Sequence, residues 1–194
     1  MRVRQSLSSE PIRSWRQLSS HTARDNPHEI GEQEMVTGIV IPHDSDMPVY
    51  EQQFAELTDY QEAVGGYIEP IRLTTAKLTM YANEEGKVHR LPRNRRATAL
   101  WWLLDPIERA LEELVGNVVV IGAPHGTFTS ASVPDDLHHL LLGAARFRVE
   151  IETVAHPDWR RTEVEFDNYF DAALHALLYA DADDAVIDVR VVEQ

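Results

Sequence analysis

The chain contains no cysteine among its 194 residues. This absence excludes disulfides, thiol catalysis and zinc sites built on cysteine. Lysine is scarce as well, because only Lys77 and Lys87 contribute to the 18 basic residues. No apolar run reaches the roughly 18 residues that a membrane span requires, since Gly116 and Gly143 interrupt the longest candidates. The chain begins with MRVRQSLSSEPIRSW, which has no apolar segment after its basic residues, so we expect no secretory signal and a cytoplasmic protein.

Motifs of known enzyme classes are also missing. The sequence has no GxGxxG, no Walker loop, no GxSxG and no HExxH. Four consecutive polar residues at 43–46 (HDSD) are typical of a solvated turn, because residues in such a turn rarely all bind one ion. His138 and His139 are neighbours on a predicted helix and therefore face different directions, and His125 is interpreted as a loop residue. We expect no enzymatic activity, no catalytic residue, no cofactor and no metal site.

The net charge of −14 is spread unevenly along the chain. Residues 1–34 carry five basic and five acidic residues, residues 35–126 carry eight and thirteen, and residues 127–194 carry five and fourteen. The last third therefore has a balance of −9, which would repel DNA and anionic membranes. We expect no direct nucleic-acid or membrane partner. A host protein with a basic surface could approach this region, although acidic surfaces also serve solubility alone.

Polarity patterns predict an α+β fold with a mixed or mostly antiparallel sheet. Residues 1–34 are polar and are predicted to be a mobile extension, in which the spacing of Ile12, Trp15 and Leu18 permits a helix over residues 10–19. Residues 35–126 form the predicted α+β domain, in which NEEGK at 83–87 is a predicted turn whose Gly86 is able to take a left-handed conformation. Its predicted strands are 35–42, 47–52, 67–73, 76–81 and 117–122, and its predicted helices are 54–64 and a region from Asn94 to about Leu114.

Residues 127–194 are predicted to form an acidic β-β-α-β appendage. Residues 133–142 suggest a short helix, and residues 146–154 alternate apolar and charged side chains like a strand. A turn is expected at His156–Pro157, followed by a strand over 162–166, a helix over 168–179 and a strand over 185–192. The unit from Phe147 to Val192 is regular enough to be separable from the first domain.

A polar site is predicted in the middle of the first domain. The helix that begins near Asn94 offers free backbone N–H groups, and three neighbouring arginines add positive charge, so an anion could bind there. A strand carrying Glu69 would run beside one that ends at Asn83, at the same end of the sheet. The candidate ligand-binding residues are Glu69, Asn83, Glu84, Lys87, Arg93, Asn94, Arg95 and Arg96. An arginine–glutamate network that fixes the turn and the helix to the sheet is the competing explanation.

Three motifs in this order carry a family resemblance. GGYIE (65–69), NEEGK (83–87) and PRNRRAT (92–98) resemble a family of uncharacterised proteins, mostly from actinobacterial phages and plasmids, known only as a domain of unknown function. The resemblance covers roughly residues 35–122 and implies an accessory protein of a mobile element. It brings no established catalytic residues. Pro70 after Glu69 and the long predicted helical region at 101–113 depart from the compact pattern of the family.

Several functions remain open on the sequence. The first is a non-enzymatic accessory protein of a phage or plasmid that binds a small anionic, nucleotide-like ligand or a host protein. The second is an acidic decoy that imitates DNA and inhibits a host nuclease or restriction complex. The basic cluster from Lys87 to Arg96 argues against the second, because a mimic needs carboxylates arrayed like phosphates. A structural or assembly protein of a virion is the third.

Overall fold

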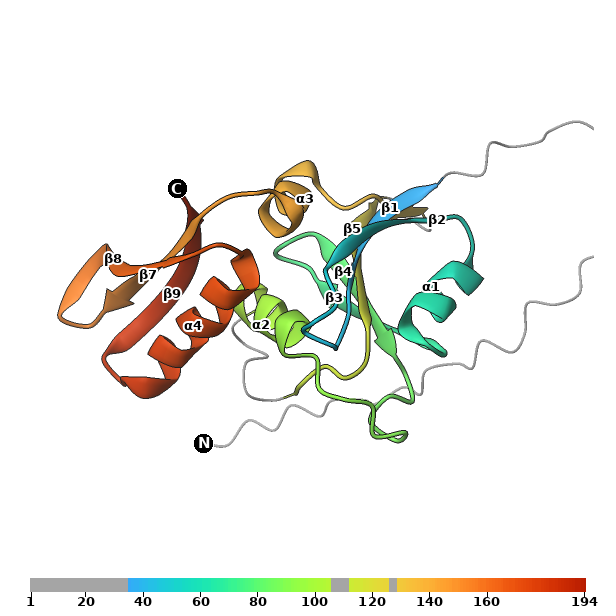
Figure 1. The fold of residues 1–194 in the computed structure, drawn as a ribbon, viewed down its shortest axis with the longest axis horizontal. Helices are drawn as coiled ribbons and strands as arrows, with labels where there is room; N and C mark the ends of the chain where they lie inside the picture. Colours follow the sequence, from blue (N-terminus) through green and yellow to red (C-terminus); the bar gives the residue numbers. More distant parts are fainter. Residues whose placement is uncertain (1–34, 106–111, 126–128) are drawn as a thin grey trace, which may run out of the picture. The chain divides into compact units, whose positions relative to one another are not determined.

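The fold of the chain is α+β, as predicted. The structure, a computed structural model, describes residues 35–105, 112–125 and 129–194 (Figure 1). Its strands form two sheets in which all neighbours are antiparallel. The first sheet has the order β2-β1-β5-β4-β3, with β6 paired to β5. Its strands are β1 (Val36–Ile41), β2 (Tyr50–Phe54), β3 (Ile68–Leu73), β4 (Leu78–Asn83), β5 (Val118–His125) and β6 (Thr129–Ala131).

The first sheet buries both of its faces. Successive side chains of a strand point to opposite faces, and the apolar runs in β1, β4 and β5 therefore supply two separate clusters. One cluster contains Ile39, Met80 and Val120, and it packs against α2 (Arg95–Leu104) and α3 (Asp135–Leu142). The other contains Val40 and Ile121, and it packs against α1 (Leu57–Val64). Figure 1 shows α1 and α2 on opposite sides of this sheet.

Local sequence fixes both ends of α1. The Asp59 carboxylate accepts hydrogen bonds from the backbone N–H groups of Ala55 (2.7 Å) and Glu56 (2.9 Å), and these bonds lower the pKa of Asp59. The helix ends at Gly65, whose φ of 76° is a left-handed conformation that disfavours residues with a Cβ. α1 begins at Leu57 rather than at Phe54, because Phe54 is the last residue of β2.

The second sheet and α4 form the predicted β-β-α-β unit. Its elements are β7 (Phe147–Thr153), β8 (His156–Phe166), α4 (Tyr169–Ala182) and β9 (Val186–Glu193), and the sheet order is β8-β7-β9. The turn expected at His156–Pro157 is wrong, because β8 already begins at His156 and pairs it with Thr153. The turn lies two residues earlier, at Val154 and Ala155.

One hydrophobic core joins this unit to the first sheet. A single cluster of buried residues contains Met80 of β4, Leu100 and Trp101 of α2, Phe170 of α4 and Val149 of β7. α4 lies between the two sheets in this cluster, because it contacts α2 as well as β7 and β9. The residues before and after the predicted boundary at residue 126 therefore contribute to the same hydrophobic core.

Three further expectations concern Gly86, the length of the helix after Asn94, and residues that the structure does not describe. Gly86 does not use the left-handed conformation that is open to a glycine in this turn. It is required for space instead, because a Cβ there would lie 2.8 Å from Val115 Cγ2 and 3.1 Å from the Asn83 carbonyl oxygen. The predicted helical region after Asn94 ends at Leu104, and residues 113–114 are not helical. Residues 106–111 and the predicted helix at 10–19 lie outside the described residues.

Candidate functional site

The arginine-rich segment at 93–96 is held in place by Asn94. This residue is fully buried and caps α2 by accepting a hydrogen bond from the Ala97 N–H (2.9 Å). Its side-chain N–H groups donate to the carbonyls of Ile41 (2.8 Å) and Gly116 (2.9 Å). The polar atoms of Asn94 are thus engaged inside the protein, and its role is to join α2 to the ends of β1 and β5.

Arg96 binds the loop between β1 and β2 to the start of α2. Its guanidinium donates to the carbonyl oxygens of Met47 (2.9 Å), Pro42 (2.8 Å) and Asp44 (2.6 Å). Burial lowers the pKa of Arg96, while the carboxylates of Asp44 and Asp171 act in the opposite direction. Its Nε has no hydrogen-bond partner among the described residues. Most of the hydrogen-bonding capacity of Arg96 is therefore used for structure.

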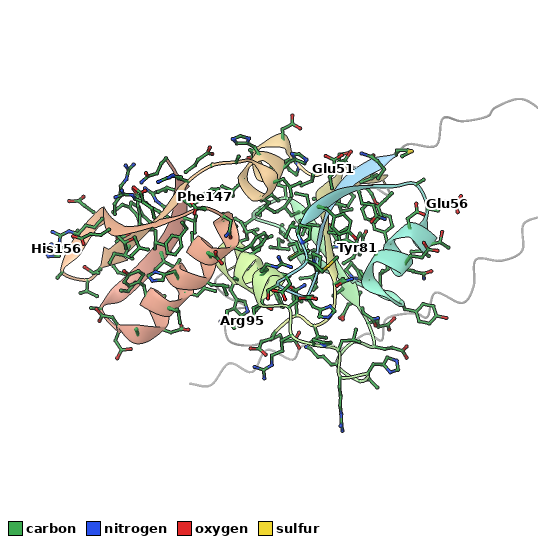
Figure 2. All side chains as sticks on the ribbon, in the orientation of Figure 1. Glu51, Glu56, Tyr81, Arg95, Phe147 and His156 are labelled. Carbon is green, nitrogen blue, oxygen red and sulfur yellow. The ribbon has the colours of Figure 1, made fainter. Side chains whose placement is uncertain are left out.

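Arg93 and Arg95 are both exposed but differ in their partners. Arg93 forms an ion pair with Glu113, with Nε 3.0 Å from one carboxylate oxygen and the terminal nitrogen 3.4 Å from the other. The Arg95 side chain has neither an ion pair nor a hydrogen bond within the described part of the chain. Figure 2 labels Arg95 at the first turn of α2, where the backbone N–H groups of a helix also favour anions.

These arginines line a cavity of about 530 Å³, here called the arginine cavity. The loop after β1 contributes His43 and Ser45, and the first turn of α4 contributes Asn168 and Asp171. Apolar side chains complete the wall, from Val49, Leu141, Leu142, Phe170 and Leu174. The N-terminal ends of α2 and α4 therefore meet at this cavity, with three guanidinium groups against one carboxylate.

A second cavity of about 260 Å³ adjoins the first along α2 and α4. Both are lined by Arg93, Arg95 and Leu174, which connects them. The second cavity, here called the tryptophan groove, is mainly apolar, with Trp102 and Leu177 in its wall. The Trp102 Nε1–H donates to the Glu112 carbonyl (3.0 Å), which fixes the ring. The two cavities together offer a charged compartment beside an apolar, partly aromatic one.

The other predicted site residues lie elsewhere. Asn83 is buried on the α1 side of the first sheet, where its amide donates to the Gly65 carbonyl (2.9 Å) and accepts from the Glu85 N–H (2.9 Å). A Cβ on Gly66 would lie 2.5 Å from the Asn83 amide nitrogen, so the second glycine of GGYIE is required for this contact. The GGYIE and NEEGK motifs are thus joined by packing.

Exposed charges surround that turn without forming a cavity with Arg95. Glu84 is exposed, and Lys87 pairs with Glu112 (3.1 Å), where both side chains are more than half exposed. Glu69 is exposed on the edge strand β3 opposite Ala82, and therefore on the sheet face opposite to that of Asn83. Of the eight predicted residues, Arg93, Arg95 and Arg96 come together in one cavity, while Glu69, Asn83, Glu84, Lys87 and Asn94 do not line it.

Sequence patterns did not point to the residues that α4 brings to the cavity. Asn168 accepts a hydrogen bond from the Asp171 N–H (2.9 Å) and so caps α4. Asparagine followed three residues later by aspartate before an apolar stretch is a recognisable helix start, but the sequence does not indicate that this start faces Arg95. His43 and Ser45 were interpreted as a solvated turn, and both are in fact exposed while lining the cavity.

Two negative findings apply to the described residues. Within ranges 35–105, 112–125 and 129–194, no group of three or more histidine, aspartate or glutamate side chains is placed to hold a metal ion. None of the helices in these ranges combines the length and the apolar character needed to cross a membrane.

Comparison with known proteins identifies the first domain. No curated protein and no solved structure matches the chain. A family model described as a domain of unknown function, DUF3846, matches residues 36–143. This match extends beyond the region of resemblance at 35–122 and takes in β6, which is a strand of the first sheet, and α3, which packs on that sheet. Because the match spans more than half of the 194 residues, the chain belongs to the DUF3846 family.

Proposed function

We propose that this chain is a non-enzymatic binding protein whose arginine cavity holds a small anionic, nucleotide-like ligand. The observation that carries the proposal is the position of Arg95. Its guanidinium has no partner within the described residues, it lies at the start of a helix, and it lines both cavities. An unpaired arginine in such a position can bind a phosphate or carboxylate through two parallel hydrogen bonds.

The tryptophan groove is the reason for proposing a nucleotide-like ligand rather than a bare anion. A ligand whose charged group contacts Arg95 in the arginine cavity could extend past it to Trp102. A flat base or another aromatic group would then contact an indole ring that is already fixed by its hydrogen bond. Asp171 at the other wall could accept a hydrogen bond from a sugar hydroxyl or an N–H group.

The competing explanation, a purely structural arginine network, makes different use of the same residues. This explanation requires an ion pair between Arg95 and Glu69. The structure instead shows an ion pair between Arg93 and Glu113. Arg96 does serve structure through its three backbone carbonyls. The network explanation therefore accounts for Arg93 and Arg96, whose side chains have structural partners. It does not account for Arg95, which has no such partner among the described residues.

A thermal-shift screen with mononucleotides, pyrophosphate and dicarboxylates tests the proposal. A ligand at 100 times its Kd stabilises the folded state by about 2.7 kcal/mol, which raises the Tm of a domain of this size by roughly 5–10 °C. Arg95→Ala should abolish this shift and leave the Tm of the unliganded protein nearly unchanged, because losing an exposed charge alters stability by about 0.5 kcal/mol or less.

Arg72→Ala is the matched control for that experiment. Arg72 is an exposed arginine on β3 that lines neither cavity, so its loss changes the net charge equally and should leave the ligand shift intact. Equal loss of the shift in both variants would indicate general charge attraction and remove the proposal. A strongly destabilised Arg95→Ala without any ligand response would support the structural explanation.

Two further proposals concern the biological setting and the decoy alternative. An accessory role in a phage or plasmid rests on the motif resemblance described above. The decoy would depend on the acidic residues of 127–194, but the structure pairs Glu150 and Glu165 with two arginines each. These pairs compensate the charge of Glu150 and Glu165, so the decoy would rest on the exposed acidic residues near the end of α4 and in β9, Asp181, Asp183, Asp184 and Asp188. Substituting these four together should weaken inhibition of a DNA-cutting complex if the decoy exists.

A further inference from the structure

A separate pocket of about 340 Å³ lies on the α1 side of the first sheet, away from the arginine cavity. Three aromatic side chains from different elements line it: Phe54 at the end of β2, Tyr60 of α1 and Tyr81 of β4. Val36, Leu57 and Ile68 add aliphatic surface, and Ser130 of β6 closes one side. Its volume is near the lower end of the range for ligand pockets, which suits a small head group.

The three rings are held in fixed orientations. Phe54 and Tyr60 stack with centroids 4.4 Å apart and an interplanar angle of 14°, and Tyr60 meets Tyr81 edge-on at 5.1 Å. Phe54 and Tyr60 are almost completely buried. Burial raises the pKa of Tyr60 to about 12, with the charge of Tyr81 adding to the rise and a hydrogen bond from Ser130 opposing it. Tyr81 is half-buried and therefore supplies the accessible ring, which Phe54 and Tyr60 hold in a fixed orientation.

Among the described residues that line this pocket, Glu56 is charged and none is basic. α1 and its cap contribute Glu56, Asp59 and Glu62 and no basic residue. Asp59 stays ionised, since its backbone hydrogen bonds lower its pKa. In Figure 2, Glu56 is labelled at the start of α1, on the same side of the sheet as this helix.

An aromatic pocket that is lined by Glu56 and lies beside an acidic helix favours one class of ligand. The faces of tyrosine and phenylalanine carry partial negative charge and attract cations, most strongly when the cation is partly removed from water. Anions would be repelled by the acidic helix. We propose that this pocket binds a substituted ammonium group. The inference does not depend on the proposed anion site, because the two sites share no lining residue.

Titration of the full-length protein with choline and with its uncharged isostere 3,3-dimethylbutan-1-ol tests the proposal. The two compounds have nearly the same shape and differ in charge, so a difference in affinity reports the cation. We expect choline to bind at least about tenfold more tightly, the size expected from cation–π attraction in a partly dry pocket. Equal affinity of the two compounds would mean a merely apolar pocket, and no binding of choline at millimolar concentration would also overturn the proposal.

Variants at Tyr81 locate the binding. Tyr81→Phe keeps the ring and should retain choline binding, whereas Tyr81→Leu removes the ring face and should weaken binding roughly fivefold or more. Tyr67→Leu is the control, because Tyr67 is exposed and lies outside the pocket. If Tyr81→Leu fails to fold, the comparison of choline with its isostere on the wild-type protein still decides the question. Arg95→Ala should not alter choline binding, which separates this inference from the anion site.

The source of the ammonium group can be distinguished with one further probe. A short peptide containing trimethyllysine presents the same head group from a protein side chain. Binding at least about tenfold tighter than choline would point to a partner protein that contributes more contacts. Equal or weaker binding would point to a free small molecule. Competition between choline and the peptide is expected in both cases, and its absence would contradict a shared pocket.

Discussion

Two buried asparagines, Asn83 and Asn94, connect elements that are distant in sequence. Asn83 holds the end of α1 against the turn after β4, and Asn94 holds the start of α2 against β1 and β5. An amide suits both positions because it donates and accepts at the same time. A buried carbonyl that loses its donor costs free energy, so both side chains should matter more for stability than ordinary surface caps.

Replacing Asn94 by alanine should strongly destabilise the protein. The variant loses the helix cap and leaves the carbonyls of Ile41 and Gly116 without their donor, which together should lower the free energy of unfolding by about 2–4 kcal/mol. Asn168→Ala is the matched comparison, since Asn168 caps α4 but is exposed, and should cost only about 1 kcal/mol. Urea unfolding of both variants measures the difference. Similar losses in the two would show that the buried bonds of Asn94 contribute little.

At the scale of elements, ion pairs link the three strands of the second sheet on the face opposite to α4. Glu150 on the central strand β7 is buried and accepts hydrogen bonds from Arg161 of β8 (2.9 Å) and Arg190 of β9 (2.8 Å). Arg190 in turn lies over the Trp159 ring, 4.1 Å from its centroid. A carboxylate between two strands that each supply an arginine links all three strands of the sheet. Breaking such a pair leaves the other charges without compensation.

This link should make the stability of the protein depend on acid pH. The hydrogen bond from Arg161 lowers the pKa of Glu150 below the ordinary value of 4.5, burial opposes this, and Arg190 lowers the pKa further. A group with a lowered pKa in the folded state stabilises the protein above its unfolded-state pKa, and this stabilisation is lost as the pH falls through the folded-state pKa. Glu150→Gln should lower the free energy of unfolding by about 1–2 kcal/mol at pH 7. The difference from wild type should shrink as the pH falls below 4.5.

Denaturant unfolding between pH 7 and pH 3 measures this effect, with Glu152→Gln as the control. Glu152 lies two residues further along β7 and faces Asp188 rather than an arginine. The difference in the free energy of unfolding between wild type and Glu152→Gln should not shrink at low pH. A constant difference between wild type and Glu150→Gln across this range would contradict the role assigned to the two arginines.

At the scale of the whole molecule, the family domain and the remaining residues share one core. The buried cluster contains α2 of the matched region and α4 of the C-terminal unit, which lies beyond residue 143. The arginine cavity has the same origin, because α4 supplies Asn168 and Asp171 to a site whose arginines belong to the family domain. The proposed anion site therefore needs both parts of the chain.

Expression of residues 1–126 tests the predicted separability of the C-terminal unit. The fragment would lose β6, α3 and α4 and would expose Leu100 and Trp101, which are almost completely buried in the whole protein. We expect it to unfold without a cooperative transition and to bind hydrophobic dyes, because large exposed apolar patches are typical of incompletely packed states. Cooperative unfolding of a soluble fragment would instead support the boundary at residue 126.

The outcome for the individual motifs shows what a sequence pattern can and cannot convey. The prediction that Asn94 begins a helix is confirmed, because capping depends on residues three positions apart. Gly65 of GGYIE has a local reason to be glycine, its left-handed φ, but the reason for Gly66 is the Asn83 side chain, 17 residues away, and Gly86 of NEEGK is required partly by Val115. The prediction grouped Glu69 with Asn83 because their strands are neighbours. The register places them on opposite faces, and a shift of one residue decides the face.

The sequence by itself determined the fold class, the order of most elements and the excess of acidic residues in the last third. These properties depend on local periodicity, on caps and turns, and on composition, which are present in any short window of the chain. Only the tertiary structure decided that α4 lies against α2, that Arg95, with no partner among the described residues, lines one cavity with Trp102, and that three aromatic residues from β2, α1 and β4 line one pocket. Such contacts join residues far apart in sequence, and their formation depends on how whole faces pack together, which no local pattern specifies.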